Sequence, residues 1–286
     1  MKRTVALLSF ALAAVAAHAG LLAGSDLVGP ALAPALTRSL GEAAARDFRG
    51  SLDGIRDLRA GRAAVALVFI REEEIPSEVT KGEWVAAPVA YQPIYVSVHM
   101  ANKAGEIDLA TLGGLFGDSP DIRYDTWECL PAAGLTQAPF AILTTPGKGL
   151  TASQFRFGVL GGGRFKRTVR FADGNDTVEN RAVSSPNCIA LTSRPPTTGN
   201  LKVLAIADGR PGRSNRAYLP TASNLHSGDY PLRVTLYALW SKAGKKEAAP
   251  LAKVVLSQEA AKLLTEKGLA PAPENIRKKF EQSLDS

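Results

Sequence analysis

Short apolar runs alternate with amphipathic stretches along this chain, beginning at residue 21. The apolar run 21–23 predicts a strand, the polar turn Gly24-Ser25-Asp26 follows it, and leucines at helical spacing over 32–40 predict a helix. A longer apolar run, 63–70, predicts a buried strand, and its lack of alternation suits a parallel sheet covered on both faces. The repeated strand, loop and helix pattern predicts an α/β protein.

The same reasoning predicts the remaining elements. A loop at 50–54, with a capping Ser or Asp, is expected to precede a short helix that ends at Gly61. Extended segments are expected at 46–49, 88–100, 141–144, 203–206 and 234–239. Further helices are expected at 108–116, 151–160, 176–183, 251–267 and 274–284.

Residues 1–19 have the pattern of a cleavable signal peptide. Lys2 and Arg3 precede an apolar run over 5–17, and Ala17-His18-Ala19 supplies the small residues of a cleavage site. The alternative, a membrane anchor, needs about 20 apolar residues, and no Cys follows the run to carry a lipid. We therefore expect a soluble periplasmic protein.

The basic residues are dispersed, which argues against nucleic acid as a partner. The formal charge of +7 falls to +5 without Lys2 and Arg3. The one tight cluster lacks a recognised nucleic-acid motif and is typical of a solvated face; it contains Arg164, Lys166, Arg167 and Arg170.

Cys129 and Cys188 are the only cysteines. An oxidising compartment makes them a candidate disulfide, and two buried free thiols are the alternative.

Catalytic motifs are missing from the sequence. There is no Gly-x-Ser-x-Gly elbow, no Walker phosphate loop and no dinucleotide fingerprint. His99 and His226 have no second ligand at metal spacing. We therefore expect a protein that is not an enzyme and that uses neither a cofactor nor a metal.

Polar, glycine-containing loops stand between the predicted strands and helices. Backbone N–H groups at a helix start, with Ser or Thr hydroxyls, can hold an anion. Helix capping alone explains each loop taken singly. The candidate ligand-binding residues are Gly24, Ser25, Asp26, Gly50, Ser51, Lys148, Gly149 and Thr151.

Taken in order, these loops resemble the substrate-binding proteins of phosphate-type ABC transporters, a branch of the type II periplasmic binding proteins. The resemblance covers nearly all of the mature chain. It rests on Leu22-Ala23-Gly24-Ser25-Asp26, Phe48-Arg49-Gly50-Ser51, Ser257-Gln258-Glu259 and, most specifically, Gly228-Asp229-Tyr230-Pro231-Leu232.

The resemblance implies an α/β fold of two lobes, each a mixed sheet flanked by helices, joined by two crossing strands. Lobe 1 would comprise 20–92 and 215–286, and lobe 2 would comprise 93–214. It also implies a monomer that holds phosphate or a related anion between its lobes and delivers it to an ABC transporter permease at the inner membrane.

The chain departs from the family pattern at two loops. Phe69-Ile70 stands where the family has an acidic residue or a Ser-Arg pair, and Gly149-Leu150-Thr151 stands where it has an Arg and Ser-Gly-Thr. Lys148 is the only nearby cation, whereas Thr151 agrees with the pattern. An alternative function therefore stays open: a scaffold or adaptor that has lost phosphate binding and binds another protein.

Overall fold

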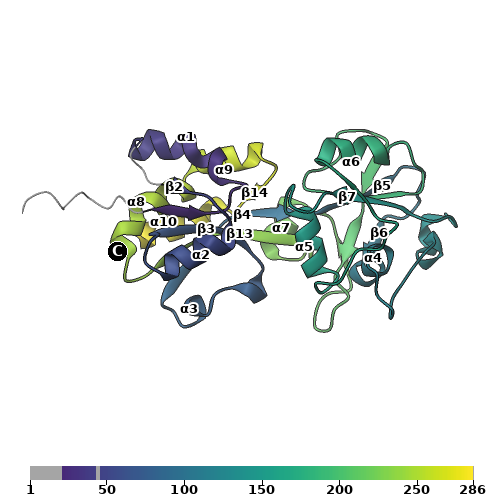
Figure 1. Cartoon of the computed structure of the whole chain (residues 1–286), viewed down its shortest axis with the longest axis horizontal. Helices are drawn as coiled ribbons and strands as arrows, with labels where there is room; N and C mark the ends of the chain where they lie inside the picture. Colours follow the sequence, from purple (N-terminus) through teal and green to yellow (C-terminus); the bar gives the residue numbers. More distant parts are fainter. Residues whose placement is uncertain (1–20, 43–45, 286) are drawn as a thin grey trace, which may run out of the picture.

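The computed structural model of this protein describes residues 21–42 and 46–285, and the predicted signal peptide lies outside this part of the chain. Two lobes lie side by side along the long axis of the molecule (Figure 1). Each lobe is built around a mixed sheet flanked by helices, which confirms the predicted fold class.

The first lobe contains a six-stranded sheet of order β14-β4-β13-β3-β1-β2. Strands β1, β2 and β3 are parallel, whereas β13 runs antiparallel to both β3 and β4. The strands are β1 (Leu22–Gly24), β2 (Arg46–Asp47), β3 (Val65–Ile70), β4 (Trp84–Pro93), β13 (Arg233–Ser241) and β14 (Ala270–Pro271).

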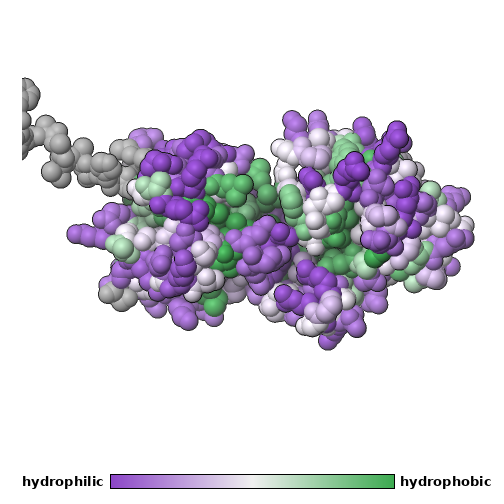
Figure 2. All heavy atoms as spheres, turned by 60° about the horizontal axis from the view of Figure 1, so that its bottom comes forward, coloured by the Kyte–Doolittle hydropathy of each residue, from purple (hydrophilic) through white to green (hydrophobic). Residues whose placement is uncertain are grey.

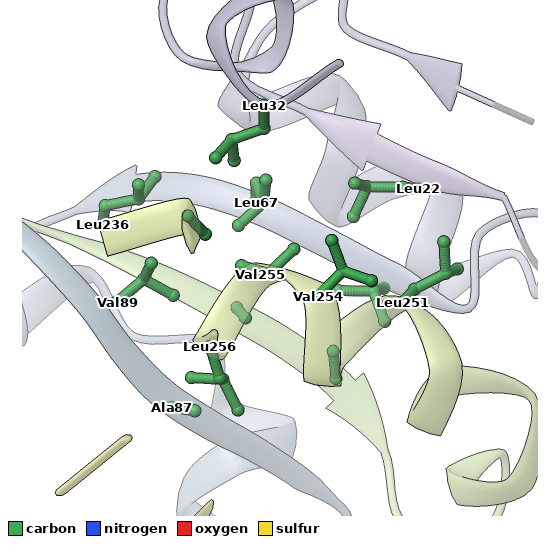
Figure 3. Packing of buried hydrophobic residues seen from close by; sticks show 14 of the residues in the cluster. Leu22, Leu32, Leu67, Ala87, Val89, Leu236, Leu251, Val254, Val255 and Leu256 are labelled. Carbon is green, nitrogen blue, oxygen red and sulfur yellow. The ribbon is translucent and has the colours of Figure 1, made fainter. Parts of the chain in front are cut away.

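Helices cover both faces of this sheet, as the apolar run over β3 predicts. Val65, Leu67 and Phe69 belong to a core cluster with α1, α8 and α9, whereas Ala66, Val68 and Ile70 pack on the opposite face with α2 and α3. Figure 3 shows Leu67 of β3 packing among Leu32 of α1 and Val255 of α8. The helices are α1 (Gly29–Leu40), α2 (Ser51–Arg59), α3 (Ser77–Thr80), α8 (Lys245–Leu256), α9 (Gln258–Glu266) and α10 (Glu274–Ser283).

The second lobe has a five-stranded sheet of order β10-β5-β9-β7-β8 and a small sheet of order β12-β11-β6. Helices α4 and α5 pack on one face of the larger sheet and α6 on the other. The strands are β5 (Tyr95–His99), β6 (Glu106–Asp108), β7 (Phe140–Thr144), β8 (Arg170–Ala172), β9 (Cys188–Thr192), β10 (Leu201–Val203), β11 (Ala205–Ala207) and β12 (Ala217–Tyr218). The helices are α4 (Leu109–Phe116), α5 (Thr151–Gly158) and α6 (Asn175–Ala182), and short 3-10 turns form at Glu72–Glu74, Trp127–Cys129 and Pro131–Ala133.

Two chain crossings join the lobes, one between β4 and β5 and one after α7 (Ala222–Ser227). At these crossings the Ile94 N–H donates to the Leu232 carbonyl at 2.8 Å, and the buried Tyr230 hydroxyl donates to the Ile94 carbonyl. The Gly-x-Tyr-Pro-Leu segment therefore forms the return crossing. The exact lobe boundaries at 92/93 and 214/215 stay predictions.

Four expected elements differ from the structure. The predicted helix 251–267 is broken at Ser257 into α8 and α9, and the predicted extended segment 88–100 is divided at Ile94 between β4 and β5, which belong to different sheets. Helix α2 already begins at Ser51, so the predicted loop over 50–54 is wrong. The predicted strand 203–206 is split at Leu204 into β10 and β11, which belong to different sheets. An apolar run does not indicate where a strand leaves one sheet and joins another. The residues before and after Leu204 are both apolar, although each set packs against a different sheet.

The candidate disulfide is also wrong, because Cys129 and Cys188 are free thiols. Cys188 begins β9 and packs with Ala190 in the cluster that α6 covers, whereas Cys129 packs against the cluster on the opposite side of the sheet. Successive side chains of a strand point to opposite faces, so the sheet itself separates the two sulfur atoms.

We predict two titratable thiols per chain after unfolding without reductant. Burial raises the pKa of the Cys188 thiol to about 11 and also raises the pKa of Cys129. Because the thiolate is the reactive form, Cys188 should not react with Ellman's reagent at pH 8 in the folded protein. Half-buried Cys129 should react slowly with the reagent, and Cys129→Ser should remove this slow reaction. Absence of both thiols in the unfolded, unreduced chain would contradict the structure.

Candidate functional site

Two of the predicted ligand loops meet at the carboxyl end of β1. The Gly50 N–H donates to the Gly24 carbonyl at 2.8 Å, and the Ser25 N–H donates to the Leu67 carbonyl at 2.8 Å. These bonds join the end of β1 to the start of α2 and to β3. We call Gly24, Ser25, Gly50 and Ser51 the serine cradle.

Glycine is required where these loops approach one another. A Cβ atom on Gly24, whose φ is +130°, would lie 2.0 Å from the Leu67 carbonyl oxygen, and one on Gly54 would lie 2.7 Å from the Gly24 Cα. Helix α2 therefore packs directly on the backbone of β1. This close approach brings its N-terminus beside Ser25.

The two cradle hydroxyls are arranged as hydrogen-bond donors. Ser51 Oγ accepts the Phe69 N–H at 2.9 Å, and Ser25 Oγ accepts the Leu27 N–H at 3.3 Å. Neither hydroxyl donates to any acceptor in the described part of the chain, so each O–H proton is available. Gly50 provides no side-chain cap for α2, and the first N–H groups of a helix have no acceptor within the helix. The cradle therefore offers donors at a positive helix end, which favours an anion.

The third predicted loop, which contains Lys148, Gly149 and Thr151, contacts the first lobe through Leu150. Thr151 is the first residue of α5 and is buried, whereas Lys148 is exposed. Leu150 packs against the first lobe's core cluster. Lys148 and Asp26 are both exposed, and Lys148 forms no ion pair with any described residue.

The substitution at Phe69-Ile70 also has a structural explanation. Both side chains are buried on opposite faces of β3, and only the backbone of Phe69 contributes to the cradle, through its bond to Ser51. The apolar residues at this point belong to the core rather than to an apolar ligand pocket.

A cavity of about 150 Å³ lies between the lobes. Figure 2 shows hydrophilic and hydrophobic residues side by side where the two lobes meet. Residues after β3, on α5, in the loop after β11 and along the return crossing line the cavity: Arg71, Glu72, Glu73, Gln154, Gly158, Asp208, Arg210, Arg213, Ser227, Gly228, Tyr230, Pro231, Leu232, Arg233 and Thr235.

Three of the four cavity arginines are paired with carboxylates. The Arg71 guanidinium lies 2.7 Å from the Glu74 carboxylate and 3.4 Å from the Glu73 carboxylate. It also donates a hydrogen bond of 3.0 Å to the Phe157 carbonyl of the other lobe. Two further pairs are Arg233 with Glu72 at 2.7 Å and Arg210 with Asp208 at 2.5 Å. Arg213 is exposed and has no ion pair among the described residues.

Two of these carboxylates, Glu74 and Asp208, have a lowered pKa. The hydrogen bond from Arg71 lowers the pKa of Glu74. Burial alone would raise the pKa of Asp208, but the hydrogen bond and charge of Arg210 outweigh it, and the pKa is lowered. The lining has four guanidinium groups and three carboxylates, and Glu74, which pairs with Arg71, brings the carboxylates around the cavity to four.

A second cavity of about 520 Å³ lies in the second lobe. It shares Gly158, Asp208 and Arg210 with the interlobe cavity and is otherwise lined largely by β6, α4 and the loop after β11.

Neither a metal centre nor a membrane span is found in residues 21–42 and 46–285. No group of three or more His, Cys, Asp or Glu side chains in this part could hold a metal ion, and no helix in it is long and apolar enough to cross a membrane.

Sequence reasoning named the four residues that form the serine cradle, whose ligand-binding role stays a prediction, and it did not name most residues of the interlobe cavity. Gly24, Ser25, Gly50 and Ser51 come together as the loop order predicts. Arg210, Arg213 and Arg233 were not singled out, because arginines in a polar loop and at a strand end have no distinctive spacing. Only the return of the chain to the first lobe brings them toward Arg71.

Comparison with solved structures finds the same two-lobed fold over nearly the full chain. A possible phosphate binding protein from Planctomyces limnophilus matches with a TM-score of 0.75 at 21% identity, covering 93% of this chain and 96% of that chain. An ABC-type phosphate transport receptor from Vibrio cholerae matches with a TM-score of 0.67 at 18% identity, covering 87% and 98%. PstS from Borrelia burgdorferi matches with a TM-score of 0.71 at 15% identity, covering 89% and 98%.

At these identities the likeness establishes the periplasmic-binding-protein fold. No protein-family model matches the sequence, and no curated protein sequence matches it significantly.

We predict that Gly54→Ala destabilises the protein by about 1–3 kcal/mol, because the new methyl group pushes α2 away from β1. The matched control is Gly113→Ala in α4, where a Cβ meets only ordinary contacts at 3.8 Å or more. This control should be neutral or stabilising by up to about 1 kcal/mol, because alanine favours helix. Urea unfolding midpoints measure both, and equal midpoints for the two variants would contradict the packing described for Gly54.

Proposed function

We propose that this protein is an extracytoplasmic solute-binding protein that holds phosphate or a related oxyanion between its lobes, as part of an ABC-type uptake system. The observation that carries the proposal is the pair of cradle hydroxyls. Each accepts a backbone N–H and keeps its own proton to donate, beside the N-terminus of α2. Most oxygen atoms of an oxyanion such as phosphate are hydrogen-bond acceptors, so such an ion matches a site rich in donors.

The fold and the charge of the cavity support this proposal. Solved structures with the same fold include proteins described as phosphate binding or as phosphate transport receptors. Closure of two lobes around a solute uses the space between them, which is lined by four guanidinium groups. The predicted signal peptide would place this activity in the periplasm, where the chain acts by binding and needs no catalytic group.

Phosphate should raise the melting temperature of the mature protein, because a ligand that binds only the folded state stabilises it. Ser51→Ala removes one hydroxyl donor to a charged group, so phosphate affinity should fall about 10- to 100-fold. Because this variant also removes the acceptor of the Phe69 N–H, each ligand-induced shift is compared with the same variant without phosphate.

The matched control is Ser184→Ala, whose hydroxyl is exposed and bonds only the Arg181 carbonyl. It should retain the full phosphate-induced shift. Equal shifts in Ser51→Ala and Ser184→Ala, or no shift with millimolar phosphate, would rule out the proposed site.

A scaffold or adaptor function is the second candidate, and two observations favour it. Leu150 packs against the first lobe's core cluster at the loop where the phosphate-type family has a smaller residue. Arg164, Arg167 and Arg170 are exposed and form no ion pair within the described residues. They would form a basic surface for an acidic protein partner.

If the protein is an adaptor, Arg164→Glu combined with Arg167→Glu should abolish capture of its periplasmic partner in a pull-down, whereas Ser51→Ala should leave capture unchanged. If it is a solute-binding protein, the charge-reversal variant should retain the phosphate-induced thermal shift. A partner that is captured equally by both variants would argue against the basic surface.

A further inference from the structure

We infer that helix α5 acts as a latch that holds the two lobes together through contacts made by the chain itself. The contacts lie at the start, middle and end of the helix, at Leu150, Gln154 and the Phe157 carbonyl. We call these three positions, together with Arg71 of the first lobe, the α5 latch. The inference goes beyond the proposed function and does not rest on it, because every contact is between groups of this chain.

Helix α5 presents a different side to each lobe, and Figure 1 shows it on the side of the second lobe that faces the first. Ala152 and Phe155 are buried in the core of the second lobe. Leu150, Gln154 and Phe157 follow the i, i+4, i+7 spacing of a single helix face, on the opposite side from Ala152 and Phe155. The helix is therefore anchored in one lobe and contacts the other.

A charge-assisted hydrogen bond forms the latch at the C-terminal end of α5. The Arg71 guanidinium, which follows β3 of the first lobe, donates to the Phe157 carbonyl of the second lobe at 3.0 Å. The last four carbonyl groups of a helix have no partner within the helix, and they form the negative end of its dipole. A cation from the other lobe therefore satisfies a carbonyl that the helix itself cannot satisfy.

Arg71 is held in place by its own lobe. One Glu74 carboxylate accepts both the Arg71 backbone N–H at 3.1 Å and the Arg71 guanidinium at 2.7 Å. A guanidinium group is planar and its donors have fixed directions, so the bond to Glu74 also orients the donor that reaches α5. The contact with Phe157 thus requires little further loss of side-chain entropy.

The other two contacts lie near the crossing strands and at the start of the helix. Gln154 Nε2 donates to the carbonyl of Gln92, in the last part of β4, at 3.3 Å. Leu150 packs against the core cluster of the first lobe. Because a helix moves as a rigid unit, movement of α5 away from the first lobe would break all three contacts together.

The latch is also part of the wall of the interlobe cavity, because Arg71 and Gln154 both line it. Widening this cavity by moving the lobes apart therefore includes breaking the latch. The free energy of the latch contacts would set the fraction of molecules that are open at any time.

Small-angle X-ray scattering tests the latch on the mature protein, refolded from urea into buffer without phosphate or other solutes. Arg71→Ala combined with Gln154→Ala should raise the ratio of open to closed molecules at least about tenfold, because it removes a hydrogen bond to a charged group and a neutral one. The radius of gyration should increase accordingly.

Circular dichroism checks that the double variant retains its secondary structure. Arg71→Ala also removes the ion-pair partner of Glu74. If the double variant fails to fold for this reason, Gln154→Ala alone leaves that ion pair intact and should still increase the radius of gyration.

Arg56→Ala is the matched control. Arg56 pairs with Asp53 three residues away, as Arg71 pairs with Glu74, but both partners lie in α2 and neither lines the interlobe cavity. This variant should keep the radius of gyration of the unmutated protein.

An unchanged radius of gyration in the folded double variant would overturn the inference. An equal increase in Arg56→Ala would overturn it as well, because the cause would then be a general loosening of the first lobe. Neither outcome depends on phosphate, so the thermal-shift experiment tests the proposed function separately.

Discussion

The antiparallel pairing of β4 with β13 is the interaction on which the rest of the structure depends. These two strands lie side by side in the first lobe, and both crossings between the lobes adjoin their paired ends, where Arg233 is opposite Pro93. The bond from Ile94 to Leu232 continues the pairing past the edge of the sheet. Because both crossings meet there, the relative position of the lobes depends on a short hydrogen-bonded segment, a typical arrangement for hinged closure.

The hydrogen bonds that the serine cradle already makes explain why it suits an anion. Leu67 and Gly24 provide the carbonyl acceptors that fix the loops, and backbone N–H groups satisfy the oxygen atoms of both serines. The groups that remain are hydroxyl protons and the first N–H groups of α2, all of which are donors. Burying such donors without a partner is unfavourable, so a bound oxyanion would supply the acceptors that the fold leaves out.

The interlobe cavity differs from the cradle, because most of its charged side chains are already paired with opposite charges. Ion pairs hold Arg71, Arg210 and Arg233 in the wall and prevent four like charges from repelling one another in a small space.

The local sequence pattern was sufficient to predict many of the strands, helices and loops of this protein. The unbroken apolar run of β3 predicted a strand covered on both faces, and glycine and serine at the ends of β1 and before α2 predicted the loops that meet as the cradle. Three features depended on contacts between residues far apart in the sequence: the start of α2 at Ser51, the separation of Cys129 from Cys188 by a sheet, and the gathering of arginines from both lobes. Periodicity records which side of an element is buried, but not which partner buries it, and only the tertiary structure decides that.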